Sequence, residues 1–283
     1  MTRPIVKRID EGMDPREVHC TTYQMRNCYR QFYDGCASEL DAHCYFQHAA
    51  AADLCSRGGA VLDVCCGRGL LIPMLRYRAK ADPSLYVGVD IHPQNARWKD
   101  GADPRREAVE KPDGWGFPCL FVESDVATMA APTLAACKAA DPAFKGFDLI
   151  VYTSAIEHMQ PEAQQSSLKE ARTLAAAGAT MYLSCPVTHS APGRTGYDTQ
   201  YKAHIYEPTM AELNTWLDAA GWRVDRQVGL CCKTRTFRQA LTGHRLDYAE
   251  RIYRDMPREQ ALPTIACLFP QAADEMALIC SPK

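Results

Sequence analysis

The sequence predicts an α/β protein built on a doubly wound, mostly parallel sheet of seven strands. Three observations predict it: short apolar segments of strand length recur along the chain, helical segments separate most of them, and a glycine turn follows the first. Apolar runs this short are typical of strands buried on both faces of a sheet. The seven expected strands are residues 60–66, 85–91, 119–126, 147–153, 180–186, 222–230 and 275–280.

Helix signals lie between these segments. A helix is expected to begin near Pro161, because proline is favoured in the first helical turn, and to end at Gly178. Thr209 and Glu212 have the spacing of a capping box, which predicts a helix from there to Gly221. Further helical stretches are expected within residues 16–58, 69–81 and 248–255.

These elements predict a division of the chain into two parts. Residues 1–58 form an N-terminal helical segment, and residues 59–283 form the sheet domain. Two polar stretches, near 93–118 and 187–208, interrupt the alternation of strands and helices and are expected to be insertions. Additions of this kind sit over the ligand crevice in such folds, so we expect the N-terminal segment and both insertions to build a lid.

Composition narrows the classes of function. The chain has 283 residues, 47% of them hydrophobic, and a net charge of −2. It therefore has no overall basic field that would recruit nucleic acid. The first residues lack the apolar core of a signal peptide, and no later apolar run has the ~18 residues needed to cross a membrane. We expect a cytoplasmic protein without a membrane partner. The sequence leaves open whether the chain forms a homo-oligomer.

Cysteine is abundant, with fourteen residues, but the spacing does not indicate a metal site or a disulfide framework. No CxxC pair occurs, which excludes the common zinc and thioredoxin spacings. Without a secretory signal, disulfides are not expected either. The sequence therefore predicts mostly small, buried, reduced cysteines and no metal.

The turn after the first expected strand has the features of a cofactor site. Small residues, Cys66, Gly67 and Gly69, stand where the backbone has to approach a ligand beyond a strand end. The GxGxxG spacing and the GKS or GKT of a P-loop are both absent, so this turn does not bind phosphates. Asp90 ends the second strand, where a carboxylate can accept hydrogen bonds from both ribose hydroxyls. A cofactor with a ribose but no phosphate here points to S-adenosylmethionine.

The third and fourth strands end in polar residues as well. Asp125 can accept from an adenine amino group, and Val126 offers a backbone N–H to the ring. Thr153 and Ser154 end the fourth strand. Since the carboxyl ends of parallel strands meet at one edge, these residues are expected to line one crevice.

Taken in order, the segments VLDVCCGRG, YVGVDI, ESDV, FDLIVYTSAIEHM, EARTLAAAGATMYLSCP and HIYEPTMAELNTWLDAAGWRV resemble the class I S-adenosylmethionine-dependent methyltransferases over roughly residues 55–230. The resemblance implies that Asp63 to Gly69 line the methionine end of the cofactor. The chain departs from the family pattern at Cys65, where glycine is more common, and at the segment AAAGAT before the fifth strand. The cofactor-binding residues expected are Asp63, Cys65, Gly67, Gly69, Asp90, Ile91, Ser124, Asp125, Val126 and Thr153.

A thiol in this turn would lie near a helix N-terminus and a sulfonium. Both features lower a thiol pKa, so Cys65 and Cys66 are candidates for alkylation. Their expected role is nevertheless one of size and backbone shape.

Methyl transfer to an alcohol or phenol benefits from a general base, for which histidine is suited near neutral pH. The candidates are His158 after the fourth strand, His189 after the fifth, and His204 before the capped helix. Each also has a structural alternative: His158 can orient a loop, and His204 can dock its loop to the sheet. Catalysis by proximity alone needs none of them. Tyr33, Tyr197 and Tyr201 are expected to contact the acceptor.

The expected reaction is methyl transfer to oxygen or nitrogen of a small molecule. Two alternatives stay open: methylation of nucleic acid or protein, and a non-catalytic scaffold that binds the cofactor. Against amino-methylation of nucleic acid, YTSA stands where an NPPY-type tetrapeptide is expected. Against pyrimidine C5-methylation, Cys185-Pro186 has the reverse order of the required pair. The intact acid and glycine set argues against a chain that has lost the cofactor.

Overall fold

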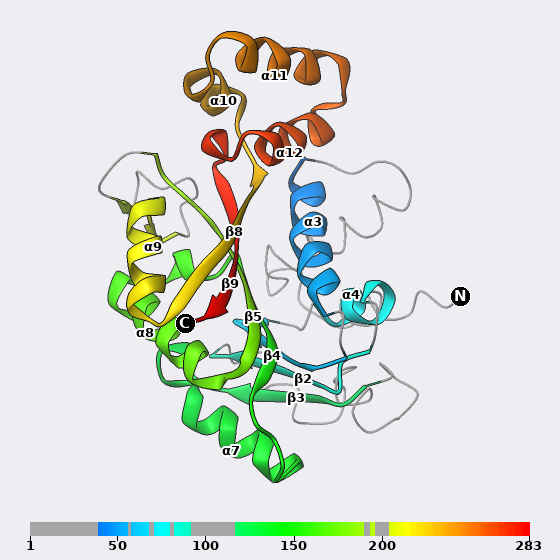
Figure 1. Ribbon diagram of the computed structural model, residues 1–283, viewed down its shortest axis with the longest axis vertical. Helices are drawn as coiled ribbons and strands as arrows, with labels where there is room; N and C mark the ends of the chain where they lie inside the picture. Colours follow the sequence, from blue (N-terminus) through cyan, green and yellow to red (C-terminus); the bar gives the residue numbers. More distant parts are fainter. Residues whose placement is uncertain are drawn as a thin grey trace, which may run out of the picture.

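The computed structural model describes residues 39–55, 58–67, 71–79, 82–91, 117–189, 193–195 and 204–283 (Figure 1). Within these ranges one seven-stranded sheet forms the core, which confirms the predicted fold class. From edge to edge its strands are β3 (Cys119–Glu123), β2 (Leu85–Asp90), β1 (Ala60–Val64), β4 (Phe147–Thr153), β5 (Ala175–Pro186), β9 (Glu275–Pro282) and β8 (Trp222–Cys231).

The strand order places a switch point in the middle of the sheet. Strands β1 to β5 run parallel, and β9 runs antiparallel to both β5 and β8. The chain proceeds from β1 to β2 and β3 on one side and then continues with β4 on the other side of β1. Doubly wound sheets bind ligands at this reversal, beyond the carboxyl ends of the strands.

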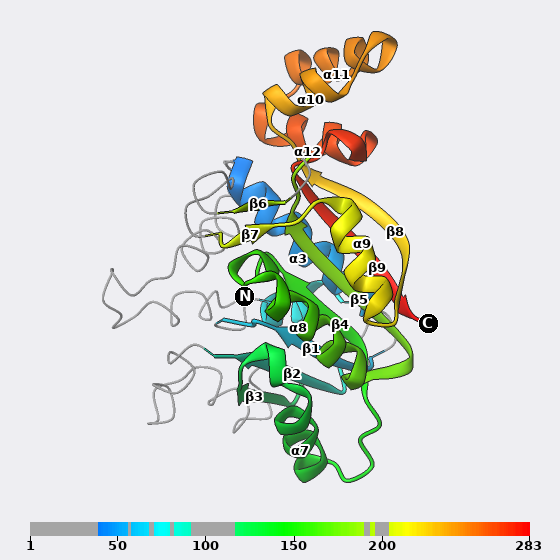
Figure 2. The same cartoon turned by 90° about the vertical axis from the view of Figure 1, so that its left-hand side faces the viewer.

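Helices cover both faces of the sheet (Figures 1 and 2). Strand β1 shows why both faces need cover: Val61 and Leu62 are fully buried, and they belong to two different apolar clusters on opposite faces. The cluster that contains Val61 includes residues of α3 (Glu39–Leu54) and α4 (Leu71–Arg78). The cluster that contains Leu62 includes residues of α7 (Ala130–Ala140), α8 (Pro161–Leu174) and α9 (Met210–Ala219).

The structure confirms the predicted capping box in full and the predicted helix from Pro161 only at its start. The capping box is confirmed, because Glu212 N–H donates to Thr209 Oγ1 at 3.1 Å and Thr209 N–H donates to Glu212 Oε2 at 2.8 Å. Helix α8 begins at Pro161, as predicted, but the predicted end at Gly178 is wrong. The helix ends at Leu174 and β5 begins at the next residue, because Ala175 pairs with Phe147 of β4.

A helical insertion separates β8 from β9, and only its middle was predicted. It comprises α10 (Thr234–Ala240), α11 (Gly243–Asp255) and α12 (Arg258–Leu268), which extend beyond the end of β8 in Figure 1. Helix α12 packs on β8 and α3. Its inner face is fully buried and consists of Ala261, Leu262, Ile265 and Ala266.

Gly229 of β8 lets α12 lie directly on the sheet, because a Cβ there would overlap the backbone carbonyl of Ala266. Gly229→Ala is therefore expected to lower the free energy of unfolding by about 1–3 kcal/mol. Gly178 is the matched control, since a Cβ there meets no atom of the described part of the chain within 4 Å. Gly178→Ala should stay within about 0.5 kcal/mol of the parent protein. Urea denaturation measures both variants, and equal destabilisation would contradict the packing argument.

The predicted insertions are described only in part. A ribbon of β6 (Arg194–Thr195) and β7 (Tyr206–Glu207) lies within the stretch 187–208. The stretch 93–118 lies outside the described residues except for its last two, and the N-terminal segment is described from residue 39 onward. The lid therefore stays a prediction.

None of the helices in the described ranges combines the length and the apolar character that a membrane span requires.

Candidate functional site

The turn after β1 has a strained backbone that aims an N–H group at Asp90. Cys65 and Gly67 both adopt a left-handed conformation, with φ of 57° and 51°. A non-glycine residue there costs about 1–3 kcal/mol, and such strain concentrates at functional sites. The Gly67 N–H donates to Asp90 Oδ2 at 2.8 Å. This hydrogen bond joins the turn after β1 to the end of β2, and the two form one structural unit. The predicted cofactor residue Gly69 lies outside the described residues.

Cys66 has a packing role in this unit. Its N–H donates to the carbonyl of Val89 at 3.1 Å, and its thiol lies against Gly88 of β2. A Cβ at Gly88 would stand 2.6 Å from Cys66 Sγ, so the glycine makes room for the thiol. Cys66 is buried, in agreement with the interpretation of these cysteines as small apolar residues.

The Cys65 thiol is not acidic, so the expectation of a lowered pKa is wrong for this residue. Burial raises its pKa well above the usual value, and the carboxylates of Asp90 and Asp63 raise it further. The neighbouring Tyr152 hydroxyl opposes this shift only in part. Cys65 therefore stays protonated near neutral pH.

Asp63 lies beneath the turn rather than on its surface. Only 4% of the residue is exposed, and the Tyr86 hydroxyl donates to Asp63 Oδ2 at 2.6 Å. Burial raises the pKa of this carboxyl to about 7, which the Tyr86 hydrogen bond opposes and the charge of Asp90 reinforces. Its described contacts hold β1 to β2.

This raised pKa predicts a pH dependence of stability. Between about pH 4 and pH 7 the folded protein keeps a proton at Asp63 that the unfolded chain releases, so the contribution of this group to stability falls as pH rises through that window. Asp63→Asn removes this dependence. Between pH 5 and pH 8 the variant should gain at least about 1 kcal/mol relative to the parent protein. Urea denaturation at both pH values measures this gain, and parallel pH profiles would contradict it.

The ends of β2 and β3 supply a carboxylate and an exposed apolar side chain. Ile91 follows Asp90 and is 64% exposed. The Ser124 N–H donates to the Asp90 carbonyl at 3.1 Å, which links the two strand ends. Asp125 Oδ1 accepts from Ala127 N–H at 2.8 Å and so caps the short helix η2 (Val126–Thr128). Val126 is buried at the start of this short helix.

The end of β4 is tied to helix α3 by contacts that sequence reasoning missed. Thr153 is half-buried, and the next residue, Ser154, has a left-handed φ of 43°. The Ser154 hydroxyl lies 3.1 Å from Gln47 Oε1 and 3.0 Å from Glu275 Oε1. Ser184 at the end of β5 also donates to Gln47 Oε1, at 2.8 Å. No periodic signal marks Gln47, which precedes a run of alanines.

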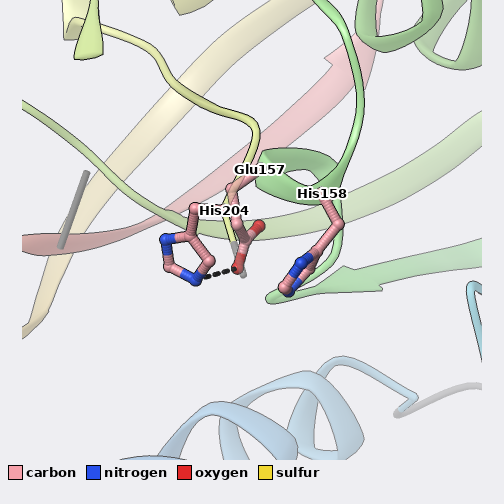
Figure 3. Close-up of side chains that lie close together, drawn as sticks. All are labelled: Glu157, His158 and His204. Atoms are coloured by element: carbon pink, nitrogen blue, oxygen red, sulfur yellow. Dashed lines mark ion pairs between the residues drawn. The ribbon is translucent and has the colours of Figure 1, made fainter. Parts of the chain in front are cut away.

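A cluster of Glu157, His158 and His204 lies just beyond β4 (Figure 3). Helix η3 (Ile156–His158) turns Glu157 inward and leaves His158 exposed. His204 comes from the segment before β7, and its ring meets the ring of His158 edge to face, with centroids 5.0 Å apart. The Ile205 N–H donates to the Glu157 carbonyl at 2.8 Å, so this segment is docked here as well.

Two buried carboxylates flank His204. Its Nδ1 lies 2.5 Å from Glu207 Oε1, and its Nε2 lies 3.9 Å from Glu157 Oε1. Glu157 is 1% exposed and Glu207 is fully buried. Strand β4 pairs in parallel with β1 up to Val64 and Tyr152, so the cluster after β4 and the turn after β1 lie at the same edge of the sheet.

His189 lies apart from this cluster. It is exposed, and its Nε2 is 2.9 Å from the Ala273 carbonyl, close to the start of β9. The predicted acceptor residues Tyr33, Tyr197 and Tyr201 lie outside the described residues.

Comparison with known proteins adds a family match. A family model described as a methyltransferase domain matches residues 41–227. No curated protein matches the sequence.

Several solved structures share the fold. The O-methyltransferase of a trans-AT PKS multienzyme from Brevibacillus brevis, in complex with S-adenosyl-L-homocysteine, has a TM-score of 0.54 at 14% identity, over 96% of this chain and 80% of that one. A TehB-like SAM-dependent methyltransferase from Corynebacterium glutamicum has a TM-score of 0.50 at 12% identity, over 94% and 99%. The cyclase SpnF has a TM-score of 0.50 at 17% identity, over 83% and 78%. At these identities the likeness is one of fold.

Proposed function

This chain belongs to the class I S-adenosylmethionine-dependent methyltransferases, and we propose that it methylates an oxygen or nitrogen of a small-molecule acceptor. The observation that carries the proposal is the position of the Glu157–His158–His204 cluster, which follows β4 at the same edge of the sheet as the strained turn after β1. The methyl donor and the residues that engage the acceptor are thereby brought to one edge of the sheet.

The described residues fit S-adenosylmethionine, which supplies an activated methyl group on a sulfonium. Among the described residues, a Cβ at Gly67 would meet no atom within 4 Å, so none of them fills the space over the turn. Asp90 stands beside this space and would hold the ribose hydroxyls. The exposed Ile91 would pack on the adenine ring, and Asp125 with the backbone of Val126 would bind the ring edge.

At the acceptor end, we assign the contact with the acceptor to His158. It is the exposed member of the cluster, whereas the buried Glu157 and His204 lie behind it. His189, which is close to the Ala273 carbonyl, is the less favoured candidate. Positioning of the acceptor oxygen or nitrogen near the methyl group, together with removal of its proton, would supply the acceleration.

A small-molecule acceptor is favoured over nucleic acid. The net charge of −2 offers no general attraction for phosphate backbones. The similar Brevibacillus brevis structure is an O-methyltransferase of a PKS multienzyme, which supports a natural-product precursor as acceptor. The cysteines Cys137, Cys185 and Cys280 are buried thiols, which suits the reducing cytoplasm as the place of action.

The test is transfer of a labelled methyl group from S-adenosylmethionine to a panel of phenols, alcohols and amines, with RNA and protein as competing acceptors. We expect label in a small molecule, together with stoichiometric S-adenosylhomocysteine. Label only in RNA or protein would replace the proposed acceptor class. Cofactor binding without transfer to any acceptor would favour a scaffold, or another reaction such as that of the cyclase which shares the fold.

A further inference from the structure

We propose that Glu157, His158 and His204 bind a divalent first-row transition-metal ion, and that this ion holds the acceptor oxygen during methyl transfer. The proposal rests on the function proposed above, since it assigns the means by which the cluster engages the acceptor. It also replaces the expectation from the cysteine pattern that the chain binds no metal.

The cluster supplies a donor set that is typical of metal sites. One atom of each residue, two imidazole nitrogens and a carboxylate oxygen, lie within 4.8 Å of one another. Two histidines and one carboxylate are a common set for Zn²⁺, Mn²⁺, Fe²⁺ or Co²⁺, with positions left open for a ligand. The three side chains converge from two segments, η3 and the residue before Ile205 (Figure 3).

The orientation of His204 also suits a metal ligand. Its Nδ1 is engaged by Glu207 at 2.5 Å, which directs Nε2 toward Glu157. A carboxylate on the far nitrogen is the arrangement that orients most histidine ligands of metals. The separation of 3.9 Å between Nε2 and Glu157 Oε1 is too long for a hydrogen bond. An ion bound to both atoms would bridge this separation.

Burial and charge also favour a cation in the cluster. Glu157 and Glu207 are 1% and 0% exposed, so two carboxylates lie deep in the protein on either side of one imidazole. A cation between them would offset this concentration of negative charge. His158 is exposed, so the open positions of the ion would be accessible at the carboxyl edge of the sheet, where β1 and β4 both end.

This arrangement narrows the acceptor to an alcohol or phenol. Its oxygen binds the ion and releases its proton to water, because a bound cation lowers the pKa of an oxygen ligand. The oxygen then forms a bond to the methyl carbon while the bond from that carbon to sulfur breaks. The bonding pair stays on sulfur, which gives neutral S-adenosylhomocysteine, and the ion keeps its oxidation state throughout.

The binding test uses the untagged, full-length, chelator-treated protein titrated with Co²⁺, whose visible absorption reports coordination. We expect saturation at one ion per chain. His158→Ala, which changes an exposed side chain, should weaken binding by at least about 100-fold, and Glu207→Gln by about 10–100-fold. His244→Ala, at an exposed position in α11, should titrate like the parent protein. Circular dichroism establishes that each variant is folded.

Two outcomes overturn the proposal: no Co²⁺ absorption in the parent protein, or the same titration for His158→Ala and the parent protein. A merely structural cluster predicts the second outcome. Methyl transfer by the chelated protein at the full rate would also overturn it, while leaving the proposed function intact. If Co²⁺ binds at the cluster but no small molecule is methylated, the proposed function fails and the ion site stands. Calorimetry with S-adenosylhomocysteine on the chelated protein checks that the cofactor site is unaffected.

Discussion

Asp90→Ala is expected to weaken S-adenosylmethionine binding by at least about 100-fold, because hydrogen bonds to a charged group contribute about 1.5–3 kcal/mol each. The substitution removes two interactions at once. One is the bond from the Gly67 N–H, at 2.8 Å, which sets the turn. The other is the proposed bond to the ribose hydroxyls. Isothermal titration calorimetry measures the loss.

Asp148→Ala is the matched control. Its carboxylate also accepts a backbone N–H, that of Ala60 at 2.9 Å, but at the amino end of β1, the opposite end of the strand from the turn. Its cofactor affinity should equal that of the parent protein. An unchanged affinity in Asp90→Ala, or equal losses in the two variants, would contradict the assignment of the ribose to Asp90.

The second large effect is expected on transfer rather than on binding. His158→Ala should reduce the rate of methyl transfer by at least about 100-fold, because the acceptor loses the group that positions it and assists removal of its proton. The affinity for S-adenosylmethionine should stay within a factor of about 2, since the cofactor contacts are assigned to other residues. Single-turnover transfer and calorimetry separate the two quantities.

His244→Ala is the control for loss of a histidine, because this side chain is exposed in α11, within the insertion between β8 and β9. His189→Ala tests the rival candidate. A loss of rate in His189→Ala as large as that in His158→Ala would show that the cluster does not hold the acceptor alone. Full activity in His158→Ala would indicate that transfer is accelerated by proximity alone.

The sheet could be predicted because its signals are local. Strands buried on both faces appear as unbroken apolar runs, and Val61 and Leu62 show the reason, since neighbours on one strand enter different apolar clusters. The insertion α10–α12 could not be predicted in full. Helix α12 is stabilised by its contact with β8, and the sequence signal for that contact is only a glycine at position 229.

The cofactor side of the site was more predictable than the acceptor side. Asp90 and Gly67 follow from the rule that ligands bind at strand ends, and their mutual hydrogen bond agrees with it. The contacts of His204 with Glu157 and His158 join residues that are far apart in the chain, and no spacing rule connects them. Tyr86 on Asp63 and Gln47 on Ser154 are likewise products of the fold.

The most direct measurement is a crystal structure of the protein with S-adenosylhomocysteine. The account predicts the ligand at the carboxyl edge between β1 and β4, with the ribose hydroxyls on Asp90 and the sulfur turned toward the Glu157–His158–His204 cluster. A ligand bound elsewhere, or one whose sulfur points away from His158, would contradict it.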